Sequence, residues 1–366
     1  MNLQFQFTAE GAWQAMLADC ERARMSIDLE NYIFADYGIG REFLDTLQAK
    51  AKSGVRVRLL LDMYGSSPLY RDTARLSELR QSGIEIAFFN PIAFWRLDNF
   101  LKWFSRRDHR KLLVVDGHVA HIGSVCIDER MRDWREASVR FDLSTEPKGV
   151  AAIANSFKTL WYAAKLGKLS RKAVQVTLAN MFDGKLEYIT STPHIGKRKI
   201  HRVLKCAFKN AKRSISLVTP YFVPTERLQR ALFRALKRGV KVKLIVPLVS
   251  DPHFADLATH EYARSLVHRG ATVLAYPTML HAKYVLIDEE HDLSWAMMGS
   301  ANLDNLSMLS NYEHVLAGSD HAFVNPIKDN FQELEKASAV FSKELMHSGL
   351  KDRLLGLLTR PIHRFL

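Results

Sequence analysis

The stretch RDHRKLLVVDGHVAHIGS (residues 107–124) indicates a duplicated fold, because a near copy of its pattern returns at residues 280–302. Side chains two apart on a strand point to the same face, so a His and a Lys at that spacing share one pocket. Each copy continues into an apolar run, LLVVD or YVLID, that is typical of a buried strand. The sequence therefore predicts two equivalent catalytic half-sites. Their motif residues are His109, Lys111 and Asp116, then His281, Lys283 and Asp288.

The rest of the chain repeats as well. ERARMSIDLENYIF (residues 21–34) matches KNAKRSISLVTPYF (209–222), and AKSGVRVRLLLD (51–62) matches LKRGVKVKLIVP (236–247). Between these segments lie helical patterns such as REFLDTLQAKA and ERLQRALFRAL. Strands that alternate with helices in both halves predict an α/β fold of two duplicated α/β/α sandwich domains. We expect them to pack pseudo-symmetrically, with one active site at their interface.

The expected domain limits follow from this repeat. Residues 1–165 form the first domain, 166–185 a linker, 186–345 the second domain, and 346–366 a basic amphipathic C-terminal segment. A chain of 366 residues that is 47% hydrophobic can bury two cores. The C-terminal segment suits either a membrane interface or a docked terminal helix. Both motifs lie in one chain, so we expect a monomer.

The composition favours an acidic partner. Lys plus Arg number 52 against 39 Asp plus Glu, a net charge of +13, which suits an anionic membrane or a nucleic acid. The three cysteines form no CxxC pair, so we expect no disulfide framework and no zinc site. We see no secretion signal and no apolar run long enough to cross a bilayer. The expected location is the cytoplasmic side of the cell membrane, with peripheral contact.

The first half carries roughly fifteen extra residues just before its motif, which the repeat places at 92–106. This segment, IAFWRLDNFLKWFSR, interleaves aromatic with basic residues and immediately precedes the first motif. Such a composition suits a lip of the active site that contacts anionic lipid. Two other interpretations stay open: a helix that packs its aromatic side chains on the core, and a nucleic-acid groove.

The motif HxKx4D followed by Gly-Ser resembles the HKD motif of the phospholipase D superfamily. The first copy has Gly123-Ser124 and the second Gly299-Ser300-Ala301-Asn302. Within that superfamily the chain is most similar to bacterial cardiolipin synthases of the short type without transmembrane helices, through ENYIFADYGIG, WREASVR, TPYFVPTERL and GSANLDNLS. The resemblance implies that a phosphatidyl group moves from one phospholipid to a hydroxyl of another, such as phosphatidylglycerol.

Phosphodiester chemistry needs a nucleophile, a proton donor and positive charge together. The resemblance implies that His109 attacks and forms a phosphohistidine while His281 acts as the acid. The two motif lysines would hold the nonbridging oxygens, and Ser124, Ser300 and Asn302 would donate hydrogen bonds to them. This scheme requires no cofactor and no metal.

Two carboxylates complete the expected site. Glu136 and Glu313 follow their histidines at the family's usual place for the group that holds the far imidazole nitrogen. Asp116 and Asp288 end their strands and are expected to be structural, holding the following turns by Asx-type bonds. Cys126 stands where the second half has an asparagine, so it is either a weak donor to the phosphate or a residue that fills core space.

Two other activities use the same residues. A hydrolytic phospholipase would accept water in place of the alcohol, and a nuclease would act on DNA with the positive charge serving its backbone. We expect phospholipid substrates, an anionic phospholipid surface as partner and no nucleic acid. The remaining histidines show no paired spacing and are interpreted as surface or core residues: His118, His121, His260 and His268.

Overall fold

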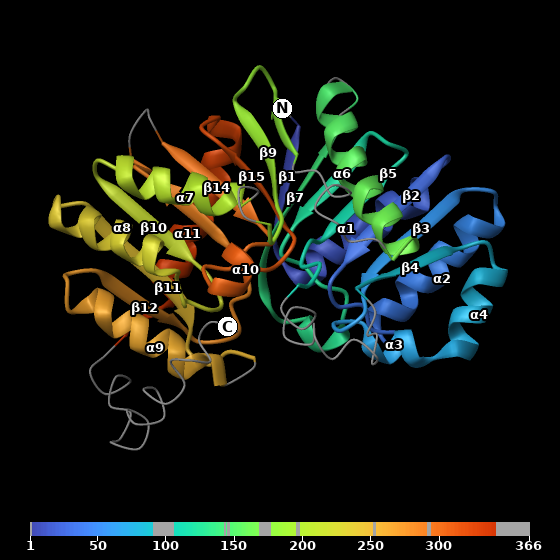
Figure 1. Ribbon diagram of the computed structural model, residues 1–366, viewed down its shortest axis with the longest axis horizontal. Coiled ribbons are helices and arrows are strands. Elements are labelled where there is room, and N and C mark those ends of the chain that lie inside the picture. Colours follow the sequence, from blue (N-terminus) through green and yellow to red (C-terminus); the bar gives the residue numbers. More distant parts are fainter. Residues whose placement is uncertain are drawn as a thin grey trace.

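The computed structural model describes residues 2–90, 106–142, 144, 147–167, 177–194, 198–251, 254–290 and 294–341. In these ranges the chain forms two sheets that meet near the middle of the molecule, with helices packed against both (Figure 1). The first sheet has the strand order β1-β7-β6-β5-β2-β3-β4. Its strands are β1 (Leu3–Thr8), β2 (Ser26–Asn31), β3 (Arg56–Asp62), β4 (Glu85–Phe89), β5 (Leu112–Val115), β6 (Val119–Gly123) and β7 (Arg135–Asp142).

The second sheet has the order β16-β12-β11-β10-β13-β14-β15-β9-β8. Without its two outermost strands this order matches the first sheet strand for strand, and in both sheets three parallel strands adjoin antiparallel ones. The duplication and the fold class are thereby confirmed. The strands are β8 (Leu178–Met181), β9 (Leu186–Ser191), β10 (Ser214–Val218), β11 (Lys241–Pro247), β12 (Thr272–Tyr276), β13 (Tyr284–Ile287), β14 (Trp295–Gly299), β15 (Glu313–Gly318) and β16 (Ala339–Val340).

The helices of the two halves also correspond. Each half places one helix before its first parallel strand and one after it: α1 and α2, then α7 and α8. A short 3-10 turn, η2 (Glu129–Met131), precedes β7. The helices are α1 (Ala9–Arg22), α2 (Ile39–Lys52), α3 (Ser67–Arg71), α4 (Thr73–Gln81), α6 (Pro147–Lys165), α7 (Lys199–Asn210), α8 (Glu226–Lys237), α9 (Phe254–Val267), α10 (Asn305–Leu309) and α11 (His321–Ala337).

Three apolar clusters hold this arrangement together. One lies between the first sheet and α1, α2 and α4, and a second lies between the other sheet and α7, α8 and α9. The third combines side chains from both halves, among them Leu60 and Val114 of the first sheet, Leu286 of the second, Phe157 of α6 and Phe331 of α11. The two domains therefore share a buried core at their junction.

The expected linker, the two segments expected to contact lipid and the expected lack of a membrane-spanning helix can each be compared with the structure. The interval 166–185, expected as a linker, contains β8, which pairs with β9 as a strand of the second sheet. Nearly all of 92–106 and the whole of 346–366 lie outside the described residues, so their contact with lipid stays a prediction. Among the helices that are described, none has the length and apolarity to cross a bilayer.

Candidate active site

Two short bridges join the halves at the residues that precede the motif histidines. Asp108 pairs with Tyr312, and Leu280 pairs with Arg135. The backbone N–H groups of the two histidines donate to the carbonyls of Tyr312, at 3.0 Å, and Arg135, at 2.7 Å. Since Tyr312 and Arg135 are followed directly by the two glutamates, each bridge carries a glutamate to the histidine of the opposite half.

The carboxylates therefore hold the histidines crosswise. Nδ1 of His109 lies 3.0 Å from Oε1 of Glu313, and Nδ1 of His281 lies 2.8 Å from Oε1 of Glu136. Each glutamate serves the histidine of the other domain, and not the one that it follows in the chain. A carboxylate accepts only, so Nδ1 carries the proton and Nε2 keeps its lone pair. Both imidazoles are thus oriented for chemistry at Nε2.

The motif serines hold these carboxylates. Ser124 Oγ donates to Glu136, and Ser300 Oγ donates to Glu313 Oε2 at 2.5 Å. Each hydroxyl also accepts a backbone N–H, from Ala137 or from the residue after Glu313. A hydroxyl has one proton to donate, so the expected hydrogen bonds from these serines to the phosphate are not available in this arrangement. The sequence could not reveal this because both acceptors are plausible partners of a serine.

The glycines before the serines allow this close approach. A Cβ at Gly123 would lie 2.4 Å from the carbonyl oxygen of Ala137, and one at Gly299 would lie 2.4 Å from that of His314. No side chain fits at such distances, because the neighbouring strand's backbone would have to move. The Gly-Ser pairs of the two motifs thus bring β6 against β7 and β14 against β15, where the glutamates stand.

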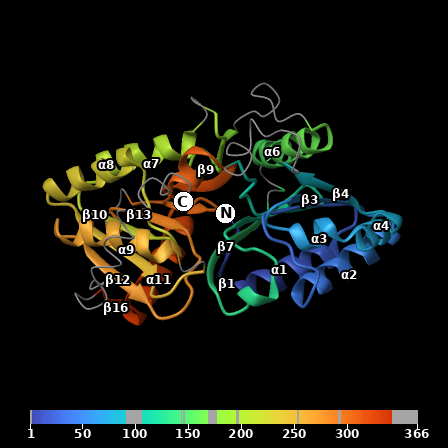
Figure 2. The same ribbon diagram turned by 60° about the horizontal axis from the view of Figure 1, so that its bottom comes forward.

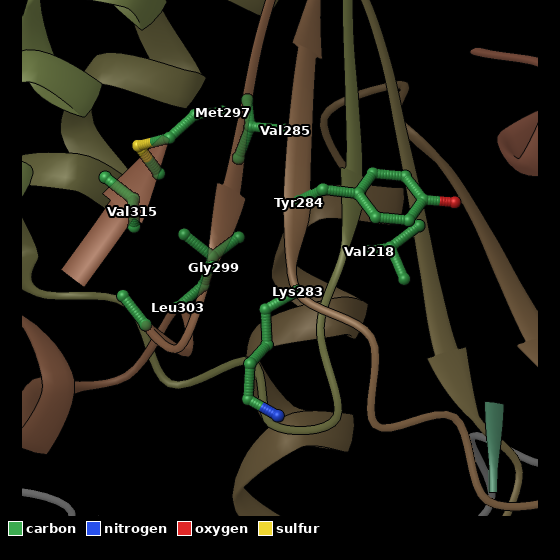
Figure 3. A pocket seen from close by; sticks show the side chains of 9 residues that line it. Val218, Lys283, Tyr284, Val285, Met297, Gly299, Leu303 and Val315 are labelled. Atoms are coloured by element: carbon green, nitrogen blue, oxygen red, sulfur yellow. The ribbon is translucent and has the colours of Figure 1, made fainter. Parts of the chain in front are cut away.

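The motif lysines lie beside their own histidines. Lys111 Nζ donates to the carbonyl of His109 at 2.6 Å, and Lys283 Nζ donates to that of His281 at 2.5 Å. An ammonium group has three protons, so each lysine keeps donors for a phosphate. Lys283 extends from the edge of a narrow pocket lined by apolar side chains such as Met297 (Figure 3). Burial lowers the pKa of Lys283 to about 7.

The pKa values of the other charged groups follow from burial and pairing. Burial lowers the pKa of His109, and it lowers that of His281 to about 4. Burial alone would raise the pKa values of Glu136 and Glu313, but the facing histidines hold both below the usual range. In the free protein at neutral pH, both imidazoles are therefore neutral beside ionised carboxylates.

The motif aspartates hold the start of another strand in their own half. Asp116 accepts backbone N–H groups of residues 24–26, the nearest being Met25 at 2.7 Å. Asp288 does the same for residues 212–214, with Arg213 at 2.6 Å. Each carboxylate thus fixes the entry of the first parallel strand of its half, which is a structural role. Its Asx bonds to the following turn stay a prediction.

The third residue after each Gly-Ser glycine differs between the halves. Asn302 is buried, and its backbone N–H donates to Ser307 Oγ at 3.1 Å. Its side chain forms a hydrogen bond with the Asp304 carboxylate. Burial raises the pKa of Asp304 to about 7. Cys126 lies in the apolar core of the first half, where burial raises the pKa of its thiol. Both side chains therefore face the protein interior, and a contact of Asn302 with the phosphate stays a prediction.

Two aromatic side chains beside the histidines had no assigned role in the sequence. The Tyr32 ring lies 5.0 Å from the His109 ring, and the Lys111 ammonium lies 5.2 Å from the centre of the same Tyr32 ring. Trp134 lies 5.2 Å from the His281 ring. Both belong to segments recognised in the sequence, ENYIF and DWREAS, but nothing in those patterns indicated that they would meet a histidine.

The described part of the chain holds no group of three His, Cys, Asp or Glu side chains arranged for a metal ion. The metal-free scheme stays a prediction. The polar groups that do converge are the crossed His–Glu pairs, their serines and the two lysines. These groups can supply a nucleophile, a proton donor and positive charge to one phosphodiester.

Comparison with known proteins agrees with this geometry. The family described as "Cardiolipin synthase, PLD-like domain" matches residues 16–161 and 204–335. Cardiolipin synthase 1 of Bacillus cereus is 29% identical over 95% of this chain and 69% of its own length. Cardiolipin synthase A of Buchnera aphidicola is 30% identical over 85% of this chain and 64% of its own length. The chain therefore spans about two thirds of the length of these relatives.

Among solved structures, the phosphatidylserine synthase of Haemophilus influenzae matches the whole fold. Its TM-score is 0.77, and the match covers 100% of this chain and 95% of the other at 12% sequence identity. At that identity the likeness concerns the fold alone. It supports the arrangement of the two duplicated domains.

Proposed function

We propose a specific reaction for this chain, which belongs to the family "Cardiolipin synthase, PLD-like domain" and is therefore a phosphatidyltransferase. It moves a phosphatidyl group from one phospholipid to the hydroxyl of another through a phosphohistidine. With two phosphatidylglycerol molecules the products are cardiolipin and glycerol. The observation that carries this proposal is the crossed pairing, which leaves Nε2 of both histidines available in one site.

In the first step His109 Nε2 attacks phosphorus and forms a P–N bond. The P–O bond to the leaving glycerol breaks, and His281 gives its proton to that oxygen. Burial holds the pKa of His281 at about 4 in the free protein. The negative charge of a bound phosphodiester beside the ring raises that pKa, so the substrate promotes protonation of its own acid.

In the second step the acceptor hydroxyl attacks the same phosphorus. His281, now neutral, takes the hydroxyl proton, and the P–N bond to His109 breaks. The glutamates keep both rings in place and favour the imidazolium when it forms. Lys111 and Lys283 neutralise the nonbridging oxygens in both steps.

Water could replace the alcohol in the second step, which would make the enzyme a phospholipase that releases phosphatidic acid. Family membership favours transfer to an alcohol. We further propose that the enzyme works peripherally on anionic phospholipid at the cytoplasmic side of the membrane. One chain holds both half-sites, which supports a catalytically complete monomer.

The test uses purified protein and vesicles of radiolabelled phosphatidylglycerol, with separation of cardiolipin, phosphatidic acid and glycerol. We expect cardiolipin and glycerol in equal amounts. Phosphatidic acid as the main product would favour hydrolysis. Cleavage of DNA by a protein that leaves the lipid intact would overturn the proposal in favour of a nuclease.

A further inference from the structure

The helices α7 and α8 carry a concentration of positive charge that the proposed mechanism does not use. The two helices, of 12 residues each, contain eight Lys and Arg against one Glu, a net charge of +7. More than half of the chain's net charge of +13 thus lies in these helices. The exposed cations among them are Arg202, Lys205, Lys209, Arg227, Arg230, Arg234 and Lys237, which we name the basic face.

Helix packing gathers these charges on one surface. α7 and α8 contact each other and run side by side over the second sheet (Figures 1 and 2). Leu204 and Phe208 of α7 and Leu228 and Leu232 of α8 point inward and are buried in the core. The apolar sides of both helices are thereby occupied, so the outward side acts through charge.

The matching helices of the first half carry no such charge. α1 and α2 contain four Lys and Arg against five Asp and Glu, a net charge of −1, although they occupy the same places in the duplicated fold. The fold itself therefore does not require a basic surface at this position. The concentration of charge on α7 and α8 is specific to the second domain.

The basic face begins next to the loop that follows Gly299-Ser300 of the second motif. The segment between β10 and α8 reaches this loop where the Val223 N–H donates to the carbonyl of Leu303 at 3.1 Å. Leu303 follows Asn302, and Thr225 caps the first turn of α8 through the N–H of Leu228. The first turn of α8, with Arg227, therefore lies beside the loop that follows the second Gly-Ser pair.

We propose that the basic face docks the enzyme on the surface of an anionic phospholipid bilayer. A cation near such a surface contributes roughly a factor of five in affinity, so several on one face give firm attachment without insertion. The inference rests on the proposed function for its choice of lipid, because the substrate lies in the same surface. A single-stranded nucleic acid is favoured less, since the exposed residues of α7 and α8 include no aromatic side chain on which a base could stack.

The test compares two fourfold variants that lose the same charge. One neutralises the basic face by Lys205→Gln, Lys209→Gln, Arg234→Gln and Lys237→Gln. The other neutralises four exposed cations of the first half by Arg24→Gln, Lys52→Gln, Arg56→Gln and Arg80→Gln. Flotation with vesicles of phosphatidylcholine, with and without phosphatidylglycerol, measures binding in the His109→Ala background, so turnover does not change the lipid.

We expect the first variant to lose on the order of 100-fold in affinity for phosphatidylglycerol vesicles and the control to lose less than about fivefold. Thermal unfolding should be unchanged in both, because every substitution is on the surface. Equal losses in the two variants, or no loss in the first, would overturn the inference. So would a loss of duplex DNA binding in the first variant with vesicle binding intact.

Failure of this inference is separable from failure of the proposed function. Transfer of short-chain phosphatidylglycerol dissolved in detergent needs the active site but no bilayer. We expect the basic-face variant, with both histidines intact, to keep this activity within about threefold. An enzyme that binds vesicles through the basic face yet makes no cardiolipin would contradict the proposed function alone.

Discussion

Behind the first half-site lies a buried polar network, and behind the second lie apolar side chains at the matching positions. Arg110 donates to Glu30 at 2.7 Å and to Ser156 at 2.5 Å, and it lies 3.5 Å from Asp108. Burial raises the pKa of Glu30 well above its usual value. The second half has three apolar residues in place of Glu30, Asp108 and Arg110: Val218, Leu280 and Ala282.

Around the histidines the two half-sites are nearly the same. Both have a crossed His–Glu pair, a serine on the glutamate and a lysine on the histidine carbonyl. Strand bridges and the Gly-Ser approach set this geometry, and both are features of the duplicated backbone. The duplicated backbone thus holds the chemical groups in place, while the layer of side chains behind them differs between the halves.

The largest expected effect tests whether the half-sites are redundant. His109→Ala and His281→Ala should each lower cardiolipin formation by at least about 10⁴-fold, because nucleophile and acid act on one phosphate. The double variant should lose little more than either single one. If one variant kept more than about a hundredth of the activity, the two histidines would not act as a unit.

Neutralising one of the two glutamates should affect the histidine of the opposite domain, because the His–Glu pairs are crossed. Glu313→Gln should change the imidazole ¹⁵N chemical shifts of His109, and Glu136→Gln should change those of His281, because each amide then faces the opposite domain's ring. Turnover should fall by about 10²–10⁴-fold in both. NMR of ¹⁵N-histidine-labelled protein checks this, and a response of His109 to the Glu136 change would contradict the pairing.

The buried polar network behind the first half-site should affect the free energy of unfolding. Arg110→Met leaves the buried side chains of Glu30 and Asp108 without the guanidinium that they share, so we expect a loss of about 3–5 kcal/mol in the free energy of unfolding. The triple change Glu30→Val, Asp108→Leu and Arg110→Ala copies the second half and should cost less than the single one. Urea denaturation compares them. A triple variant less stable than Arg110→Met would show that apolar side chains cannot replace this polar network in the first half.

The smallest effect concerns pH. Lys283, with its pKa at about 7, is cationic below that pH and neutral above it. Because kcat/KM follows the free enzyme, in which the pKa of His281 is about 4, it already declines with rising pH as this acid loses its proton. We expect a further fall of roughly tenfold above pH 7, as the Lys283 charge on the phosphate is lost. Arginine does not titrate in this range, so Lys283→Arg should have a lower maximum but no such fall. An unchanged descending limb in that variant would assign the titration to another group.

The sequence was sufficient for the fold class because its signals are local. His and Lys two residues apart on a strand must share a face, and the Gly54 and Gly239 segments repeat the same helix-to-strand step. The positions of the glutamates could also be read from the resemblance. Their partners could not, because Glu313 lies 204 residues from His109 and meets it only through a bridge between domains.

The basic face illustrates the same limit. Each of its charges is visible in the sequence, where ERLQRALFRAL was recognised only for its apolar spacing. That α7 lies beside α8, and that α8 starts next to Leu303, depends on the tertiary fold. The partner of Ser124 is hidden for a related reason, because only the tertiary fold shows that its hydroxyl donates to Glu136.

A burst experiment with a phosphatidyl p-nitrophenyl ester, whose leaving group needs no acid, tests the roles of the two histidines directly. His281→Ala should release about one equivalent of p-nitrophenolate and then stop, because His109 carries the phosphatidyl group and no base activates the acceptor. Mass spectrometry should locate the group on His109. His109→Ala should give no burst. A burst from His109→Ala with the label on His281, or release without any labelled histidine, would contradict the assignment of His109 as the nucleophile.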